Sequence, residues 1–363
     1  MKSVLPGWVG WPRLDFTLLS AVLLLMGFGL LVLYSASGAD SGVVYGQAAR
    51  VGTGLAVMLA LSLVPPYVLR SWTPWLYVLG IALLLVTWLI GEGKGADRWL
   101  DLGIIRFQPS EIMKLSVPMM AAWYFHPRGL PPSMKDTFVA FAVLAIPAAL
   151  IARQPDLGTA LLIGVSGCIT IFLAGLRWRH MLMLAGLAAV TAPALWYVMR
   201  DYQRNRVYTF LNPESDPLGS GWNIIQSKIA VGSGGLFGKG WMQGTQSHLE
   251  FIPERHTDFI LAVLAEEFGL VGVALVLVMY LFITGRCSYV AGMAKDTYSR
   301  LLAGSLGFTF FVYVVVNSGM VSGILPIVGV PLPLISYGGT SIVTLLAGFG
   351  IVMSIHGHRN FIR

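Results

Sequence analysis

FIPERHTDFILAVLAEEFGLVGVALVLVMYLFITG, residues 251–285, places a group of titratable side chains directly before a long apolar run. The run that follows Asp258 is longer than the roughly 20 apolar residues that cross a bilayer as a helix. Four titratable residues, from Glu254 to Asp258, precede it, and two more acids, Glu266 and Glu267, lie inside it. The stretch therefore predicts a membrane-spanning helix with its chemistry concentrated at one end.

The composition of the whole chain agrees with this fold. Of its 363 residues, 56% are hydrophobic and 11% are charged, whereas a soluble protein has about 25% charged residues. Apolar runs of spanning length recur from end to end. We predict an all-α, polytopic membrane protein of about ten transmembrane helices, a single domain over residues 1–363 with one large extracytoplasmic loop, 200–257, between helices seven and eight. The predicted helices are 16–36, 51–69, 71–91, 111–127, 137–152, 157–176, 181–199, 258–285, 301–324 and 337–355.

The distribution of charge predicts the topology. With the N-terminus placed in the cytoplasm and the long loop left out, twelve Lys and Arg fall on the cytoplasmic side and six on the other. Short loops rich in Lys and Arg stay in the cytoplasm. Fourteen of the seventeen acids fall on the outer side. We therefore predict cytoplasmic termini in a bacterial inner membrane and titratable chemistry that faces outwards. The net charge of +7 follows from this topology and requires no nucleic-acid partner.

Every even-numbered predicted helix enters the membrane from the outer face. A helix N-terminus carries about half a positive charge and unpaired N–H groups, which suit an anion. If these ends converge, they form an outward-facing polar cavity under the long loop. The helix starts concerned are residues 108–111, 154–156, 257–258 and 336–339.

Two groups of charged residues in the predicted helices have both structural and functional interpretations. Glu111 and Lys114 stand three apart and can pair on one helix face, either as a local salt bridge or as a functional pair, since charge at a span's edge is costly. Asp258 is either an ordinary helix N-cap or a general base. Glu266 and Glu267 must face protein or water, and packing inside a helix bundle is the favoured interpretation.

Two glycine-rich or proline-rich segments interrupt the helices. GSGGLFGKGW, residues 232–241, fails as a phosphate-binding P-loop, because the glycine spacing is one residue too long and Gly240 replaces Ser or Thr after Lys239. It remains either a turn whose lysine meets a diphosphate or merely a turn. Between 326 and 339, prolines and glycines separate the last two spans. We predict a re-entrant segment or a broken helix beside the cavity, with a tight external loop as the alternative.

Several long motifs resemble those of the shape, elongation, division and sporulation (SEDS) family of the bacterial envelope, from the first helix to the last. They are RWLDLGIIRFQPSEIMK, QPDLGTA, DPLGSGWNIIQSKIAVGSGGLFGKGW, PERHTDFILAVLAEEFGLVG and NSGMVSGILPIVGVPLPLISYGGTS. Arg255 and the ESDPLG segment resemble the rod-shape members more than the division members.

This resemblance implies a peptidoglycan glycosyltransferase that polymerises lipid II at the outer leaflet during cell elongation. Implied partners are a class B penicillin-binding protein transpeptidase and membrane proteins of the elongation complex. Asp258 matches the family's essential aspartate, Glu111 and Lys114 match its QPSE-x-x-K pair, and Asp156 matches the acid of QPDLG.

The chemistry is consistent with this assignment. One carboxylate can take the proton of the acceptor hydroxyl, and a diphosphate leaving group needs positive charge nearby. We predict Asp258, Glu111 and Lys114 as catalytic residues, with Asp258 as general base, Lys114 facing the diphosphate and Glu111 orienting Lys114. The predicted substrate-binding residues are Arg106, Asp156, Arg204, Arg206, Lys228, Lys239, Arg255 and His256.

The sequence requires no cofactor and predicts no metal site, although a divalent cation is an open alternative: His248, Glu250, Glu254 and His256 could surround one. Two other functions are also open. A transporter that flips lipid II would place ionisable residues near the membrane midplane, where only Glu266 and Glu267 lie deep. A scaffold for a partner synthase would not need so many titratable groups at the outer helix ends.

Overall fold

The computed structural model describes residues 14–90, 99–101, 106–199, 201–215, 220–248 and 251–358. Over these residues the chain is almost entirely helical, so the all-α prediction is confirmed. The small exception is a hairpin of two short strands, β1 (Leu100–Asp101) and β2 (Arg106–Phe107), which pair antiparallel with Leu100 opposite Phe107.

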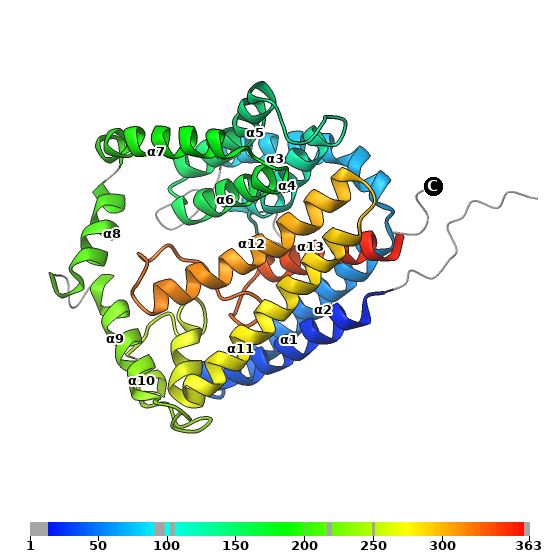
Figure 1. The fold of residues 1–363 in the computed structure, drawn as a ribbon. Helices are drawn as coiled ribbons and strands as arrows, with labels where there is room; N and C mark the ends of the chain where they lie inside the picture. The colour runs from blue at the N-terminus through cyan, green and yellow to red at the C-terminus, as the bar shows by residue number, and fades with distance from the viewer. Residues whose placement is uncertain are drawn as a thin grey trace, which may run out of the picture.

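Ten long helices occupy the ten predicted positions within the described residues (Figure 1). They are α1 (Phe16–Ala36), α2 (Ser41–Leu63), α3 (Pro66–Ile90), α4 (Ser110–Phe125), α5 (Met134–Arg153), α6 (Leu157–Leu173), α7 (Trp178–Val198), α11 (Ile260–Met293), α12 (Thr297–Val321) and α13 (Thr340–His358). Seven of them, α1, α2, α3, α5, α11, α12 and α13, are long and apolar enough to cross a membrane, and α6 is a shorter apolar helix. The chain is therefore a multi-pass helical membrane protein.

Side-chain caps fix where several helices begin. The Asp15 carboxylate accepts a hydrogen bond from the Leu18 amide at the start of α1. Asp40 does the same for α2, which begins at Ser41 rather than at the predicted 51. α3 begins at Pro66 rather than at 71, because proline suits the first position of a helix, where its missing N–H is not needed. These two starts correct the predicted boundaries.

The predicted long loop is itself partly helical. It contains α8 (Asp201–Leu211), the 3-10 turn η1 (Pro213–Ser215), α9 (Ser220–Ser233) and the short α10 (Thr245–His248). Figure 1 shows α7, α8 and α9 following one another around the outside of the bundle. α9 packs against α11 and α12, which ties this segment to the membrane helices.

α11 is broken at Gly269, whose backbone has φ 64° and ψ −165°. The break exposes backbone groups that pair with a turn of the loop, residues 234–240, called here the glycine turn. Lys239 N donates to Glu266 O and Leu270 N donates to Gly235 O, both at 3.0 Å. A Cβ at Gly238 would lie 2.1 Å from the Glu267 carbonyl oxygen. The glycines are therefore required by close backbone contact with α11.

The two deep acids of α11 face protein, as predicted. Glu266 is 0% exposed and its Oε1 accepts hydrogen bonds from Lys239 Nζ at 2.7 Å and Thr245 Oγ1 at 3.0 Å. Glu267 is also buried and accepts a hydrogen bond from Ser35 Oγ of α1. Both carboxylates join the loop or α1 to α11.

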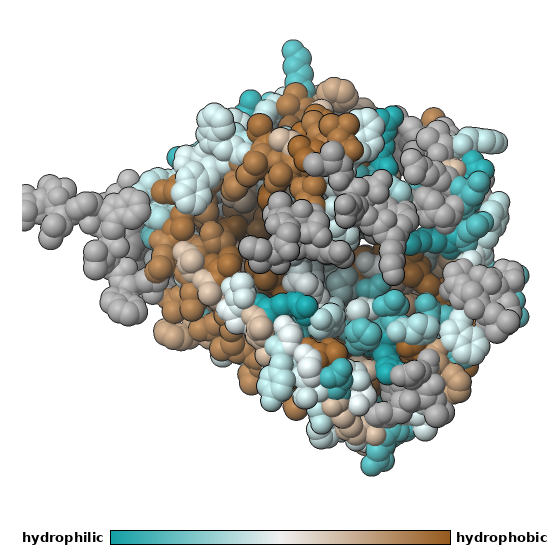
Figure 2. Space-filling model, turned by 180° about the vertical axis from the view of Figure 1, so that it is seen from behind, coloured by the Kyte–Doolittle hydropathy of each residue, from teal (hydrophilic) through white to brown (hydrophobic). Residues whose placement is uncertain are grey.

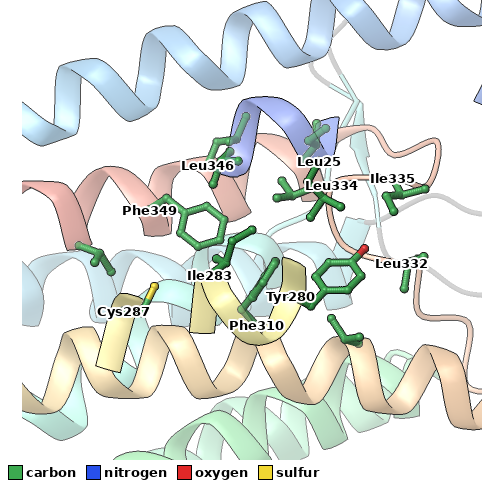
Figure 3. Close-up of a cluster of buried hydrophobic side chains, with 14 of the residues drawn as sticks. Leu25, Tyr280, Ile283, Cys287, Phe310, Leu332, Leu334, Ile335, Leu346 and Phe349 are labelled. Carbon is green, nitrogen blue, oxygen red and sulfur yellow. The ribbon is translucent and has the colours of Figure 1, made fainter. Parts of the chain in front are cut away.

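The chain between α12 and α13, residues 322–339, is non-helical and enters the bundle, so the prediction of a re-entrant segment is confirmed. Leu332, Leu334 and Ile335 are buried in the core with Tyr280, Phe310 and Phe349 (Figure 3). The Tyr280 hydroxyl donates to the Pro333 carbonyl at 2.6 Å, well inside α11. A tight external loop would not reach this core.

The surface separates by polarity. On the face shown in Figure 2, hydrophobic residues form broad areas, and hydrophilic residues gather on the side that carries α8 and α9 in Figure 1. Such apolar areas on a bundle of spanning helices are the surface expected to face lipid.

The glycine turn gives the first testable prediction. Gly238→Ala should destabilise the protein by at least about 1 kcal/mol from backbone strain alone, since φ is +78°. The collision of a Cβ with the backbone of α11 should add to this loss. Gly232→Ala is the matched control, since nothing lies within 4 Å of a Cβ there. Thermal unfolding of the purified variants measures both. Equal unfolding midpoints for the two variants would show that the turn does not need its close contact with α11.

Candidate active site

A cavity lies between α4, α6, α12 and α13 and is closed on one side by the re-entrant segment. Its empty volume is about 720 Å³, including the space open to solvent. Lys114, Thr159 and Ser341 line it from the first two turns of α4, α6 and α13, so these three helix starts converge, a condition that the sequence alone left open. The remaining lining residues are Leu115, Leu162, Leu306, Thr309, Phe310, Tyr313, Gly329, Val330, Pro331, Thr344, Leu345, Gly348 and Phe349.

Lys114 forms an ion pair with Glu111 at the polar end of this cavity. The Lys114 Nζ lies 2.7 Å from Glu111 Oε1, and the Glu111 side chain is 5% exposed. The Tyr313 ring centre lies 5.9 Å from the same Nζ. Within the described residues, the second Glu111 oxygen has no hydrogen-bond partner. The pair is thus withdrawn from solvent and leaves an acceptor unused.

Asp156 connects two of the sequence motifs. It caps α6 by accepting from the Thr159 amide at 3.2 Å, and its other oxygen accepts from Gln108 Nε2 at 3.0 Å. Gln108 belongs to the QPSE motif and Asp156 to QPDLG. Asp156 also acts electrostatically on Lys114. Asp156 therefore lies close to Lys114, and its two hydrogen bonds hold the starts of α4 and α6 together.

Asp258 lies at the rim of the same cavity. The N-cap of α11 is Phe259, without a side-chain hydrogen bond, so the interpretation of Asp258 as a helix cap is wrong. A Cβ placed on Gly329, which lines the cavity, would lie 3.6 Å from Asp258 Oδ2. The half-buried carboxylate thus lies next to Gly329, in the wall of the cavity that Lys114 also lines.

The surroundings of Asp258 change its acidity. Burial, followed by the charge of Glu254, raises the pKa of the Asp258 carboxyl to about 6, and the Arg206 guanidinium partly opposes this rise. An acid with a pKa close to the working pH can take up and release a proton readily. The geometry and the pKa both suit Asp258 to general-base chemistry.

Hydrogen bonds from α12 and the re-entrant segment fix the backbone around Asp258. Asn317 Nδ2 donates to the carbonyl oxygens of Asp258 at 2.8 Å and Val330 at 2.7 Å. Ser336 Oγ donates to the Thr257 carbonyl at 2.6 Å. The sequence interpretation missed both residues as site residues. The available signal was a polar Asn317 inside an apolar span, which requires a partner at that depth.

Two predicted substrate-binding residues lie near Asp258. Arg206 of α8 is close enough to act on its charge. The His256 ring packs edge-on against Tyr337, with ring centres 5.9 Å apart, and the Arg50 guanidinium lies 4.5 Å from the same Tyr337 ring. Arg50, from α2, was not singled out from the sequence.

Four other predicted cations have contacts elsewhere. Lys239 pairs with Glu266 at the break in α11, and Arg255 Nε donates to the Ala36 carbonyl at the end of α1. Arg204 donates to the Tyr197 carbonyl at 3.0 Å, and the exposed Lys228 of α9 lies against Gly323. None of the four lines the cavity as the described residues define it.

Arg106 and the possible cation ligands are less fully described. Arg106 belongs to β2, and its side chain lies outside the described residues, as does Glu250. Among the residues that the structure describes, no group of three or more His, Cys, Asp and Glu side chains could hold a metal ion.

With this geometry in view, comparison with known proteins identifies the family. The family model for FtsW, RodA and SpoVE, described as "Cell cycle protein", matches residues 16–361. The chain belongs to this family. The match includes every helix and every site residue described above.

Individual relatives agree with the rod-shape resemblance. The peptidoglycan glycosyltransferase MrdB of Escherichia coli (strain K12) is 52% identical over 96% of this chain and 95% of its own. A probable peptidoglycan glycosyltransferase FtsW of Trichlorobacter lovleyi is 35% identical over 94% of this chain and 92% of its own. Of these two relatives, the chain is thus more similar in sequence to MrdB than to FtsW.

Solved structures share the fold. A chain from a peptidoglycan synthase complex, in which polymerization and crosslinking are coordinated, matches with a TM-score of 0.84 and 33% identity, over 96% of this chain and 99% of that chain. The rod shape-determining protein RodA of Thermus thermophilus matches with a TM-score of 0.73 and 29% identity over the same shares. The arrangement of helices is therefore that of RodA.

Asn317 gives a prediction for the site's construction. Asn317→Ala would leave the Asp258 and Val330 carbonyls without their donor, and we expect a destabilisation of about 1–3 kcal/mol for each buried group left unpaired. Ser318→Ala is the control, since its hydroxyl has no partner within the described residues. Thermal unfolding should separate the two variants. If Asn317→Ala unfolds at the wild-type temperature, the two hydrogen bonds do not hold the rim of the cavity.

Proposed function

We propose that this chain is a peptidoglycan glycosyltransferase that polymerises lipid II into glycan strands at the outer face of the cytoplasmic membrane during cell elongation. The observation that carries the proposal is a cavity that Lys114, paired with Glu111, lines from α4, and whose wall at Gly329 is approached by Asp258, a carboxyl with a raised pKa. The activity named for MrdB, at 52% identity, supports it.

In the proposed reaction, Asp258 removes the proton from the acceptor hydroxyl as its oxygen attacks the anomeric carbon of the donor sugar. A new glycosidic C–O bond forms while the bond from the anomeric carbon to the diphosphate oxygen breaks, and that oxygen leaves with the electron pair. Attack opposite the leaving group inverts the anomeric centre, so one carboxylate is enough. Lys114 offsets the charge that develops on the diphosphate, and Glu111 holds Lys114 in place.

The cavity also fits a lipid-linked substrate. Its polar end lies at the first turns of α4, α6 and α13, and its apolar lining, including Phe310 and Phe349, runs on along α12 and α13. From Ser341 to Phe349 a helix rises about 12 Å. We propose that the sugar diphosphate binds at the polar end with the lipid directed along the apolar part.

Lys and Arg are in excess in the loops on the membrane side that carries both termini, opposite the candidate site. This excess supports cytoplasmic termini and an extracytoplasmic site. We propose a class B penicillin-binding protein as transpeptidase partner, within an elongation complex of membrane proteins. The likeness to a chain of a peptidoglycan synthase complex supports this partner. We propose that the side chains carry out the reaction without a cofactor. Comparison of the polymerisation rate with and without a chelator such as EDTA would test this.

A lipid II transporter is the alternative, and the deep acids of α11 bear on it. Glu266 is bonded to Lys239 and Thr245, and Glu267 to Ser35. Acids committed to joining segments are poorly suited to relay protons across a membrane. Their contacts favour catalysis at the surface.

Substitution of Asp258 tests the function. The complex with the cognate class B penicillin-binding protein, supplied with lipid II, should form glycan polymer with the wild type and lose nearly all of it with Asp258→Ala or Asp258→Asn, each shown to be folded and complexed. The control is Asp201→Asn, whose carboxylate is 97% exposed on α8.

The other outcomes are equally informative. Polymer from both wild type and Asp258→Asn would support the enzyme activity but show that Asp258 is not the general base. Glu111 and Asp156 would then be the next candidates. No polymer from either protein, together with lipid II crossing vesicle membranes, would make the transporter the correct function.

The pKa of Asp258 predicts the pH dependence. The general base acts as carboxylate, so the rate should fall as pH decreases through about 6. Glu254 raises this pKa and Arg206 lowers it. Glu254→Gln should therefore move the acidic limb of the kcat profile to lower pH, and Arg206→Gln should move it to higher pH. Shifts in the same direction, or none, would contradict Asp258 as the titrating base.

A further inference from the structure

The tip of the glycine turn carries two large apolar side chains that nothing in the described chain covers. Leu236 is 61% exposed and Phe237 is 81% exposed. Both lie in a segment that the sequence assigns to the outer, polar end of the molecule. The neighbouring Trp241 is 45% exposed, so the turn presents a cluster of apolar groups outwards.

The position of this tip is fixed by backbone bonds to α11. Lys239 N and Gly240 N donate to the carbonyls of Glu266 and Glu267, while Val271 N donates to the Leu236 carbonyl, all at 3.0 Å. These bonds lie on both sides of the break at Gly269. The turn is therefore held rigidly beside the uninterrupted part of α11, which begins at 270.

Two helices give the same height for the turn in the membrane. The ion pair between Asp15 and Arg286, 2.8 Å long, marks one edge of the apolar zone. Leu270 stands sixteen residues before Arg286 along α11, and Leu31 stands sixteen residues after Asp15 along α1, so each lies about 24 Å from that edge.

The turn meets both helices at this height. The Val271 amide, next to Leu270, donates to the Leu236 carbonyl, and Trp241 Nε1 donates to the Leu31 carbonyl at 3.2 Å. The hydrocarbon core is about 30 Å thick. The tip is therefore level with the hydrocarbon near its far edge, rather than above it in water.

The surfaces beside the tip are those of a lipid-facing helix. Leu270 is 59% exposed and Val271 is 52% exposed, and both continue the outward apolar face of α11. Lys239, at the other end of the turn, keeps its ammonium on Glu266. Trp241, an aromatic residue close to the apolar tip, is typical of segments at the boundary of hydrocarbon and headgroups.

We propose that Leu236 and Phe237 form a wedge inserted among the acyl chains of the membrane leaflet on the side that carries α8 and α9. The wedge anchors the glycine turn in lipid. Because the turn is bonded to both sides of the break in α11, this anchoring also stabilises the break. Its partner is a lipid surface, with no phosphate or protein needed. This inference is independent of the proposed catalytic function.

Site-directed spin labelling tests the wedge in the full-length protein. Cys168 and Cys287 are first replaced by Ala, and a nitroxide is attached after Phe237→Cys or Leu236→Cys. Gln243→Cys is the matched control, a polar exposed position six residues further along. The proteins are reconstituted in vesicles of phosphatidylethanolamine and phosphatidylglycerol, without a partner protein.

The readout is the collision rate of each nitroxide with oxygen, which enriches in hydrocarbon, and with a water-soluble nickel chelate. We expect collision with oxygen to exceed collision with nickel several-fold at positions 236 and 237, and the reverse at 243. Labels at 236 and 237 that meet nickel as readily as the label at 243 would overturn the wedge. So would an immobilised label reached by neither reagent, since that would place protein rather than lipid over the tip.

Discussion

Hydrocarbon offers no hydrogen bonds, so any non-helical backbone at membrane depth must find its partners inside the protein. The re-entrant segment between α12 and α13 is the part of this chain that meets that constraint most directly. Tyr280 satisfies the Pro333 carbonyl and Asn317 satisfies that of Val330. Asn317 also holds the carbonyl of Asp258. The contact that makes the segment tolerable in a membrane therefore also sets the candidate base against the cavity.

The buried ion pairs fall into two kinds. Asp15–Arg286 and Lys239–Glu266 join segments that are far apart in sequence, so each helps to specify the tertiary arrangement. Glu111–Lys114 lies within one turn of α4, so the ion pair itself joins no segments that are distant in sequence. A buried ion pair is often no more stable than apolar residues of similar size, while loss of one partner leaves a costly charge. Stability alone does not account for the pair on α4, which favours a functional role.

Much of the architecture follows from local patterns in the sequence. The spans are visible as apolar runs, and the helix starts that converge are visible as polar motifs at their outer ends. The prolines and glycines between the last two spans predict that the helix stops there, whereas the inward course of the segment is decided by contacts such as that of Tyr280 with Pro333. Asp258 stands out as an acid at the entrance to a span, although the sequence did not exclude it as a cap; the cap position falls on Phe259 instead.

Other features depend on contacts that no local pattern contains. An asparagine in an apolar span must be bonded, but nothing in the sequence around Asn317 indicates that its partners are Asp258 and Val330. The glycine turn has the composition of a phosphate-binding loop, yet its glycines serve backbone contact with a helix broken at Gly269. Lys239 illustrates the same limit, because its partner Glu266 was itself assigned to a helix bundle interior.

The distribution of charge around the cavity constrains how it would hold a diphosphate. Glu111 cannot lose Lys114 without leaving a buried carboxylate uncompensated, so the ammonium must keep that bond while it contacts the substrate. Its three N–H donors allow this. Asp156 places a second negative charge nearby and accepts a hydrogen bond from the Thr159 amide at the start of α6.

Lys114 is therefore largely neutralised before a substrate arrives. Among the described residues, the N-terminus of α13 and Arg206, which already acts on Asp258, are two sources of the additional positive potential that a diphosphate needs. Arg206 belongs to α8, in the long loop, so the proposed reaction would draw its electrostatics from the loop and its geometry from the membrane helices.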